Sequence, residues 1–295
     1  MTPRRRHPLL RPALGGVAHP PAVFVVGSPR SGTTYLGGVL GGFAGYVDAG
    51  ELLSPEIPAL LEMRTAEAAQ AIRKSLARNG FDLAPGSPRP VVHSPEMVFL
   101  VPALREMDPD SAVVHLIRDG RDVVASLLSL GWLAVEPPRP WDGSRSEEWK
   151  WSSASRFWTE PSRIAEFAVV PEARRAAWAW RRHITAGLAH VGNREPMATI
   201  RYEAMCRHPR RCATRLARLV GVDGDEMHEA LSGVSSAAVG QWRHRLSADD
   251  LQEVYREAGE LLRLLEFDSL PRIFDPDLAE AARGHPRLRF RALLN

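Results

Sequence analysis

The stretch that decides the fold is VFVVGSPRSGTTYL, residues 23–36. It begins with a continuous apolar run that contains β-branched residues and ends at Gly27. A run of this kind, ended by glycine, is typical of a short buried β-strand. The apolar residues that follow recur on one helical face, at Leu36, Val39, Leu40 and Phe43. The stretch therefore predicts a strand, a glycine-rich turn and a helix that begins near Ser31.

The turn has the spacing of a phosphate-binding loop without its lysine. Four residues separate Gly27 from Gly32, and Thr33 and Thr34 follow directly, where a P-loop has G-x-x-x-x-G-K-[ST]. Backbone N–H groups of such a turn, at the amino end of a helix, favour an anion. Arg30 adds a planar group of permanent charge. The loop predicts a site for a phosphate-like group; the alternative is an ordinary strand–turn–helix with a threonine-rich cap.

The machinery of a P-loop NTPase is not evident in the rest of the chain. In such enzymes the lysine and a magnesium ion neutralise the charge of the β- and γ-phosphates. No strand ends in an unmistakable magnesium-binding aspartate. A site without that machinery suits a group with less charge, and a sulfuryl group carries fewer negative charges than a terminal phosphoryl group.

Strands and helices alternate along the chain beyond this stretch. The patterns predict strands over 22–26, 46–51, 90–94, 112–118 and 197–203. They predict helices over 56–79, 97–107, 122–130, 207–220 and 247–265. Alternation of this kind indicates an α/β fold, a P-loop-like parallel sheet with helices on both faces.

Candidate functional residues follow several of these strands directly. Ligands bind outside the carboxyl ends of parallel strands, and this edge receives the loop 27–34, Glu51, His93 and Arg118. The stretch HLIRDGRDVVASLL (115–128) places Arg118 at a strand end and Ser126 on the helix that follows. It predicts a second anion site, although RDGRD could also be a solvated turn with local ion pairs.

Composition indicates an ordinary soluble protein. The chain has 295 residues, 44% hydrophobic and 25% charged, with a formal net charge of +3. This charge is too small to indicate a nucleic-acid partner. Cys206 and Cys212 suggest neither a disulfide framework nor a zinc site. We expect no membrane span and no signal peptide, and therefore a cytoplasmic protein.

The pattern predicts a single domain over 21–270, between a flexible basic arm (1–20) and a tail (271–295). Residues 131–172 form a long irregular segment, which in a compact domain is usually a lid, a binding loop or a disordered insert. Seven of the eight tryptophans lie within 132–180. Those in the loop are candidates for acceptor contact, whereas core packing explains Trp178 and Trp180 equally well.

Two blocks together resemble the sulfotransferases that use 3′-phosphoadenosine-5′-phosphosulfate (PAPS). GSPRSGTTYL is similar to the 5′-phosphosulfate loop of this family, in the arginine-bearing form shared by tyrosylprotein and many bacterial members. LIRDGRDVVAS is similar to its 3′-phosphate motif. RYEAM (201–205) and VGQWRHRLS (239–247) resemble later blocks, so the resemblance runs from about 20 to 268.

The resemblance implies PAPS as the donor, 3′,5′-ADP as the product, no metal, and a small-molecule hydroxyl acceptor. It implies donor-binding residues in four blocks: Arg30, Ser31, Gly32, Thr33, Thr34, Arg118, Ser126, Tyr202, Trp242 and Arg243. It implies Glu51, His93 and Arg30 as the catalytic set. The family's usual lysine after the third strand is replaced here by His93, in HSP.

The general base is left open between Glu51 and His93. Glu51 is favoured, because a carboxylate is ionised at neutral pH without special tuning, and His93 then donates towards the bridging oxygen of the donor. The family's base, in some members, follows the first glutamate, where this chain has Leu52. The alternatives are a helix N-terminal carboxylate for Glu51 and a satisfied core histidine for His93.

Two other functions compete with sulfuryl transfer. A P-loop kinase would need magnesium. A nucleotide-binding regulatory module would bind without turnover, and its Glu51 and His93 would not converge. The acceptor and the oligomeric state are not indicated by the sequence.

Overall fold

The structure is a computed structural model, and it describes residues 20–53, 56–81, 83–84, 86–136, 150–151, 160–190 and 197–267. Residues 1–19 of the expected arm (1–20), the expected tail (271–295) and half of the segment 131–172 lie outside the described residues. The single domain expected over 21–270 therefore stays a prediction.

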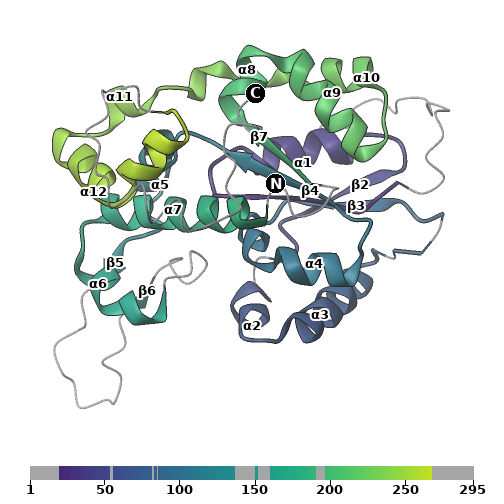
Figure 1. The fold of residues 1–295 in the computed structure, drawn as a ribbon, viewed down its shortest axis with the longest axis horizontal. Helices are drawn as coiled ribbons and strands as arrows, with labels where there is room; N and C mark the ends of the chain where they lie inside the picture. The colour runs from purple at the N-terminus through teal and green to yellow at the C-terminus, as the bar shows by residue number, and fades with distance from the viewer. Residues whose placement is uncertain are drawn as a thin grey trace, which may run out of the picture.

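A five-stranded parallel sheet forms the centre of the molecule, in the order β2-β3-β1-β4-β7 (Figure 1). Its strands are β1 (Val23–Gly27), β2 (Tyr46–Gly50), β3 (Arg89–Val92), β4 (Ala112–Ile117) and β7 (Met197–Arg201). Two short antiparallel strands pair separately, β5 (Val135–Glu136) and β6 (Lys150–Trp151). The five strands of the sheet are those that the sequence predicts, and they confirm the α/β parallel fold class.

Alternation along the central strand explains how helices cover both faces. Val23 and Val25 belong to one apolar cluster, and Phe24 and Val26 to another, because successive side chains of a strand point to opposite faces. The first cluster is closed by α1 (Thr33–Gly41), α9 (Pro209–Val220) and α10 (Gly224–Ala230). The second is closed by α2 (Ile57–Leu61), α3 (Thr65–Arg78) and α4 (Val101–Met107), with the 3₁₀ turn η2 (Pro95–Leu100).

A third apolar cluster lies beyond the end of β4. It joins α5 (Gly120–Leu128), α7 (Glu172–His190) and α12 (Ala248–Leu264), which lie together at the left of Figure 1. Trp178 and Trp180 are fully buried there, so these two tryptophans are core residues. The remaining elements are η4 (Pro161–Arg163), α6 (Ile164–Val169), α8 (Tyr202–Arg207), η5 (Leu231–Gly233), η6 (Ser236–Ala238) and α11 (Trp242–Arg245).

Helix boundaries differ from the sequence prediction where proline interrupts a pattern. Residues 202–207 form a separate short helix, α8, although residues 202 and 203 were expected as strand, and the helix expected over 207–220 is α9, which begins only at Pro209. Proline lacks an N–H and fits the first turn of a helix better than its interior. The part expected as irregular, 131–172, contains β5, β6, η4 and α6.

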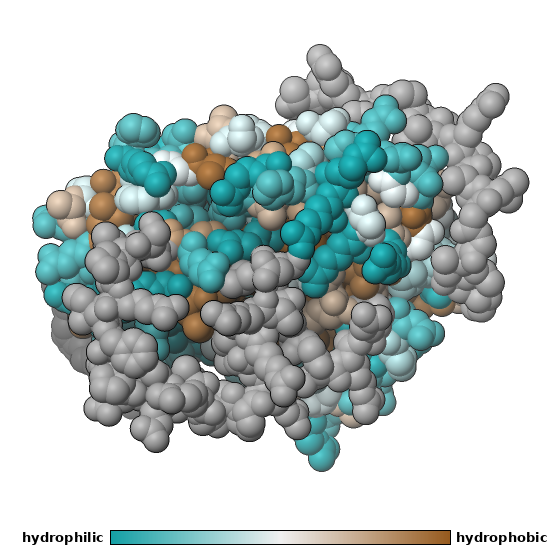
Figure 2. All heavy atoms as spheres, turned by 45° about the horizontal axis from the view of Figure 1, so that its top comes forward, coloured by the Kyte–Doolittle hydropathy of each residue, from teal (hydrophilic) through white to brown (hydrophobic). Residues whose placement is uncertain are grey.

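The surface and the helices give no sign of a membrane-spanning segment in the described part of the chain. None of the described helices has both the length and the apolar character needed to cross a bilayer. Figure 2 shows that the described residues on the face turned forward are mainly hydrophilic, with apolar side chains in small separate groups.

Candidate functional site

The loop between β1 and α1 has a backbone that only glycine permits at two positions. Gly27 has a φ of 151°, and a Cβ there would lie 2.3 Å from the carbonyl oxygen of Leu116 on β4. Gly32 has a φ of 96°, and a Cβ there would lie 2.9 Å from the ring of Tyr202. The two glycines therefore let the loop lie directly against β4 and α8.

The amino end of α1 is open to a ligand. No side chain of the described residues caps it, although the first N–H groups of a helix lack partners within the helix. The hydroxyl oxygen of Ser31 is buried and also has no partner among the described residues. These unsatisfied groups fit an anion held by the loop.

Arg30 holds an unusual backbone conformation within this loop. Its φ is 67°, a left-handed conformation that costs a residue with a Cβ about 1–2 kcal/mol. Its side chain is exposed, donates from Nε to the hydroxyl of Ser126 over 3.0 Å, and lies 5.6 Å from the ring centre of Trp132. The two predicted anion blocks thus meet through Arg30 and Ser126.

Arg118 is the buried cation of the site. It lies just after β4, is 8% exposed, and donates to the backbone carbonyls of Arg30 (2.9 Å) and Ala238. Its guanidinium lies 4.9 Å from the ring centre of Tyr202. Its Nε has no partner among the described residues. A buried donor without a partner is costly, so Arg118 is prepared for an acceptor that the described residues do not supply.

Tyr202 forms the wall beside Arg118. It follows β7, and its hydroxyl donates to the carbonyl of Ser235 over 2.8 Å. Burial raises the pKa of Tyr202, so the side chain remains a neutral phenol that can donate. The phenol thereby ties α8 to the segment that begins at Ser235.

These residues line one cavity of about 290 Å³ at the carboxyl edge of the sheet. Seven of the predicted site residues are in its lining: Arg30, Gly32, Thr33, Thr34, Glu51, Arg118 and Tyr202. Five further lining residues were not singled out by the sequence analysis: Pro29, Tyr35, Pro95, Gly233 and Ser235. The last lining residue, Trp132, is one of the tryptophans considered for acceptor contact. Tyr35 could have been found from its place directly after Thr34, whereas nothing local marks Gly233 or Ser235.

Glu51 and His93 occupy different positions relative to this cavity. Glu51 follows β2, is exposed and lines the cavity. His93 follows β3, is 5% exposed and is not in the lining. Its Nε2 lies 3.2 Å from a carboxylate oxygen of Asp48, and its Nδ1 has no partner among the described residues.

A close approach to α1 explains the burial of His93. A Cβ on Gly37 would lie 2.3 Å from Cδ2 of the histidine ring, so the absence of a side chain at Gly37 lets the ring pack against the helix. Asp48 was not singled out by the sequence analysis, because it lies on β2 while His93 follows β3, so the two are far apart in the sequence.

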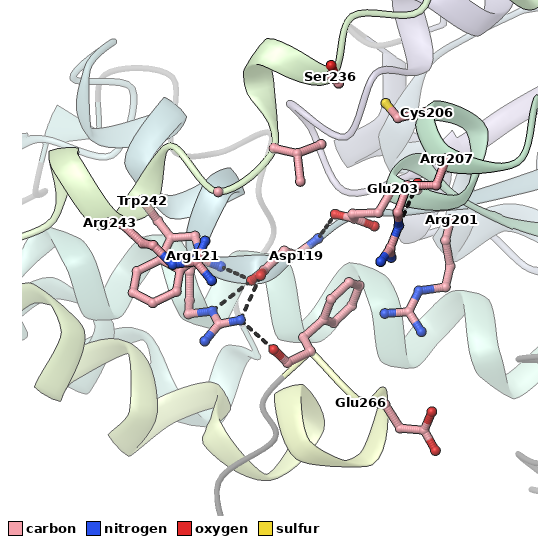
Figure 3. Close-up of a pocket in the computed structure, with 13 residues that line it drawn as sticks. Asp119, Arg121, Arg201, Glu203, Cys206, Arg207, Ser236, Trp242, Arg243 and Glu266 are labelled. Atoms are coloured by element: carbon pink, nitrogen blue, oxygen red, sulfur yellow. Dashed lines mark hydrogen bonds and ion pairs between the residues drawn. The ribbon is translucent and has the colours of Figure 1, made fainter.

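The remaining two predicted residues, Trp242 and Arg243, line a neighbouring cavity (Figure 3). The guanidinium carbon of Arg121 lies 4.2 Å from the ring centre of Trp242. The carboxylate of Asp122 accepts from the N–H groups of Gly240 (2.7 Å) and Trp242 (2.9 Å). Asp122 thus anchors this segment to α5, the helix that carries Ser126.

A metal site is not formed by the described residues: among them, no group of three or more His, Cys, Asp or Glu side chains could hold a metal ion. The two cysteines are free thiols.

Comparison with known proteins identifies the family. The model of the sulfotransferase family (Sulfotransfer_3) matches residues 21–229. No curated protein sequence matches the chain significantly. The sulfotransferase domain from the curacin biosynthetic pathway has a similar structure, with a TM-score of 0.50 and 15% identity over 83% of this chain and 98% of that domain.

Two further solved structures are similar at lower TM-scores. A sulfotransferase from Mycobacterium avium (STF9) gives 0.48, with 14% identity over 84% of this chain and 77% of that chain. A mouse sulfotransferase (SULT7A1), solved in complex with PAP, gives 0.44, with 13% identity over 90% and 88%. The family match spans more than two thirds of the sequence and contains the loop 27–34, the five strands of the parallel sheet and the stretch 115–128 that carries Arg118. The chain belongs to the sulfotransferase family and is a sulfotransferase enzyme.

Proposed function

We propose that this enzyme takes the sulfuryl group from PAPS and transfers it to a hydroxyl of a small-molecule, carbohydrate or natural-product acceptor. The observation that carries the proposal is Arg118: it is buried in the lining of the cavity and keeps one N–H donor for which the described part of the chain supplies no partner. The open amino end of α1 and the orphaned hydroxyl of Ser31 support an anion in the same place.

The residues present fit the donor. The loop from Arg30 to Thr34 would hold the phosphosulfate through backbone N–H groups, hydroxyls and a guanidinium. Arg118 and Ser126 would hold the 3′-phosphate, and Tyr202 would contact the nucleotide. We expect Trp242 and Arg243 to support donor binding through the segment that Asp122 anchors, since they line the neighbouring cavity.

The bound donor supplies the sulfuryl group. Glu51 would accept the proton of the acceptor hydroxyl as that oxygen bonds to sulfur, and it lines the cavity where the acceptor must enter. Arg30 and the loop N–H groups would stabilise the charge that develops on the departing phosphate oxygen. Trp132, beside Arg30, offers an apolar surface for the acceptor.

The proposal is tested first by reaction. The full chain is incubated with PAPS and a panel of hydroxyl acceptors, with and without EDTA, and products are examined by mass spectrometry. We expect a sulfated product in both conditions. Loss of activity with EDTA that magnesium restores would favour a kinase, and nucleotide binding without any product would favour a regulatory module.

Nucleotide selectivity provides a second test, independent of the acceptor. Wild-type protein should bind 3′,5′-ADP at least tenfold more tightly than 5′-AMP, because Arg118 forms a charge-assisted hydrogen bond to the 3′-phosphate. Arg118→Ala should largely erase this preference, whereas Arg218→Ala on the exposed face of α9 should keep it. Equal binding of the two nucleotides by the wild type would contradict the PAPS assignment.

A further inference from the structure

A second cavity, of about 320 Å³, is lined by the residues that directly follow Arg118, Tyr202 and Ser235 in the chain, namely Asp119, Glu203 and Ser236 (Figure 3). No residue lines both cavities. The second one is built from the start of α5, the β7–α8 corner, the segment 236–243 and the residues that follow α12.

Arginines dominate the charged lining of this second cavity, and one of them is already neutralised. Arg121 forms an ion pair with Asp119 at 2.7 Å and also donates to the carbonyl of Phe267. Burial works against the charge of Arg121, but Asp119 raises the pKa of its guanidinium well above the ordinary value. The pair is therefore part of the wall and is not available to a ligand.

Three further arginines of the lining have no carboxylate partner among the described residues. Arg201 lies over the ring of Phe267, 4.1 Å from its centre, and Arg243 lies 4.6 Å from the ring centre of Trp242. Arg207 makes a single long bond, 3.4 Å, to the backbone carbonyl of Glu203. Figure 3 shows Arg201 and Arg207 on one side of the cavity and Arg243 on the other.

Arg201 and Arg207 also repel each other. Burial lowers the pKa of Arg201, the charge of Glu203 opposes this, and the charge of Arg207 acts in the same direction as burial, with smaller opposing effects of Glu266 and Asp119. An anion between the two guanidinium groups would relieve this repulsion and satisfy their N–H donors. Two arginines with free donors match the oxygens of a tetrahedral oxyanion better than a single cation does.

The lining contains three carboxylates, Asp119, Glu203 and Glu266, beside its four arginines, so the arginines are in excess by one charge. Asp119 is occupied by Arg121, and Glu266 is exposed. Glu203 is 5% exposed, and one of its oxygens accepts from the N–H of Asp119 while the other, Oε2, has no partner among the described residues. Burial raises the pKa of Glu203, while the charge of Arg201 acts in the opposite direction.

We propose that the second cavity binds a tetrahedral dianion, as free phosphate or as the phosphate group of a small ester. Arg201 and Arg207 hold the oxyanion, and the rings of Trp242 and Phe267 line the space that the body of an ester would fill. The two arginines that hold the oxyanion do not line the first cavity, where the phosphosulfate is proposed to bind.

Isothermal titration of the full chain with phenyl phosphate, and separately with inorganic phosphate, tests the site. We expect saturable binding that Arg201→Gln and Arg207→Gln each weaken tenfold or more. Arg218→Gln makes the same change of charge on α9, outside the cavity, and should leave the affinity unchanged. Arg30→Ala, a change in the first cavity, should also leave the affinity for both phosphate ligands unchanged. This result would show that the ligands bind in the second cavity, whichever donor the first cavity binds.

The two ligands distinguish the source of the oxyanion. Tighter binding of phenyl phosphate assigns the site to a phosphate ester, and equal binding assigns it to free phosphate; both support the oxyanion site. Absence of saturable binding would overturn the proposal. So would the same affinity in the wild type, Arg201→Gln and Arg207→Gln, because the ligand would then bind elsewhere. Circular dichroism of each variant establishes that it is folded.

Discussion

Arg30 combines a strained backbone with a charge directed into the donor cavity. Arg30→Ala should weaken the binding of PAPS by one to two decades, because a hydrogen bond to a charged group contributes roughly 1.5–3 kcal/mol. Arg30→Gly removes the same charge, yet glycine accepts the φ of 67° without strain. Titration calorimetry should therefore show a similar loss for both variants. Wild-type affinity in Arg30→Gly would mean that the guanidinium does not contact the donor.

The proton path can be assigned by comparing Glu51 and His93. Glu51 lines the cavity, whereas His93 is buried against α1 and paired with Asp48. Glu51→Gln should lower kcat by about 10²-fold or more, the usual scale for a general base, with little change in PAPS affinity. His93→Lys should keep more activity than His93→Ala if the ring supplies a donor towards the bridging oxygen.

Steady-state kinetics with saturating PAPS separates the possible roles. Loss of turnover in His93→Ala, with Glu51→Gln nearly unchanged, would make His93 the base. Wild-type rates in both variants would remove both residues from the chemistry. Asp48→Asn is a useful companion variant, because it keeps the shape of the side chain next to His93 while removing its charge.

At the scale of elements, one carboxylate joins α5 to the segment that closes the cavity. Asp122 is 2% exposed and accepts two backbone N–H groups of that segment, at Gly240 and Trp242. Upstream in the same segment, Ala238 accepts from Arg118 and Ser235 accepts from Tyr202. Asp122 is therefore placed to position Arg118 and Tyr202, two side chains that line the cavity, and its proposed role is that of a positioning residue.

Asp122→Ala should release this segment and weaken the binding of 3′,5′-ADP at least tenfold, because two charge-assisted hydrogen bonds are lost. The KM for PAPS should rise, while kcat at saturating PAPS should change little. Asp249→Asn, at the exposed start of α12, is the matched control. An unchanged KM in Asp122→Ala would show that the segment keeps its place without this anchor.

At the scale of the whole molecule, a buried histidine links stability to pH. His115 of β4 is 0% exposed, and a Cβ on Gly187 of α7 would lie 2.2 Å from its ring. Burial lowers the pKa of His115 to about 3, and the nearby His190 and His183 act in the same direction. Between pH 6.5 and 3 the unfolded chain therefore binds a proton that the folded protein does not, so stability falls as the pH falls.

The loss assigned to His115 between pH 7 and pH 5 is about 2 kcal/mol of unfolding free energy. Urea unfolding at the two pH values should show that His115→Leu reduces this difference, whatever its effect on absolute stability. His208→Gln replaces an exposed histidine and should leave the difference as it is in the wild type. An equal pH dependence in His115→Leu and wild type would contradict the low pKa.

The sequence by itself determined the sheet and the phosphate-binding loop, because both depend on local patterns. Continuous apolar runs identify strands buried on both faces, and the five predicted strands are those of the sheet. The spacing of Gly27 and Gly32 identifies a turn whose backbone needs glycine. Since parallel strands end at one edge, the sequence also placed Glu51, His93 and Arg118 there. Helix ends were harder, because proline and tertiary packing decide them.

Only the tertiary structure decided which of these residues share a cavity. It placed Glu51 in the lining of the first cavity. It buried His93 outside that lining, where its ring contacts Gly37 of α1 and Asp48 of β2. It placed Trp242 in a different cavity from Arg118, although both belong to blocks of one family pattern. The physical reason is that side-chain direction and burial at a strand end depend on what packs against it from distant segments, and no local pattern records that packing.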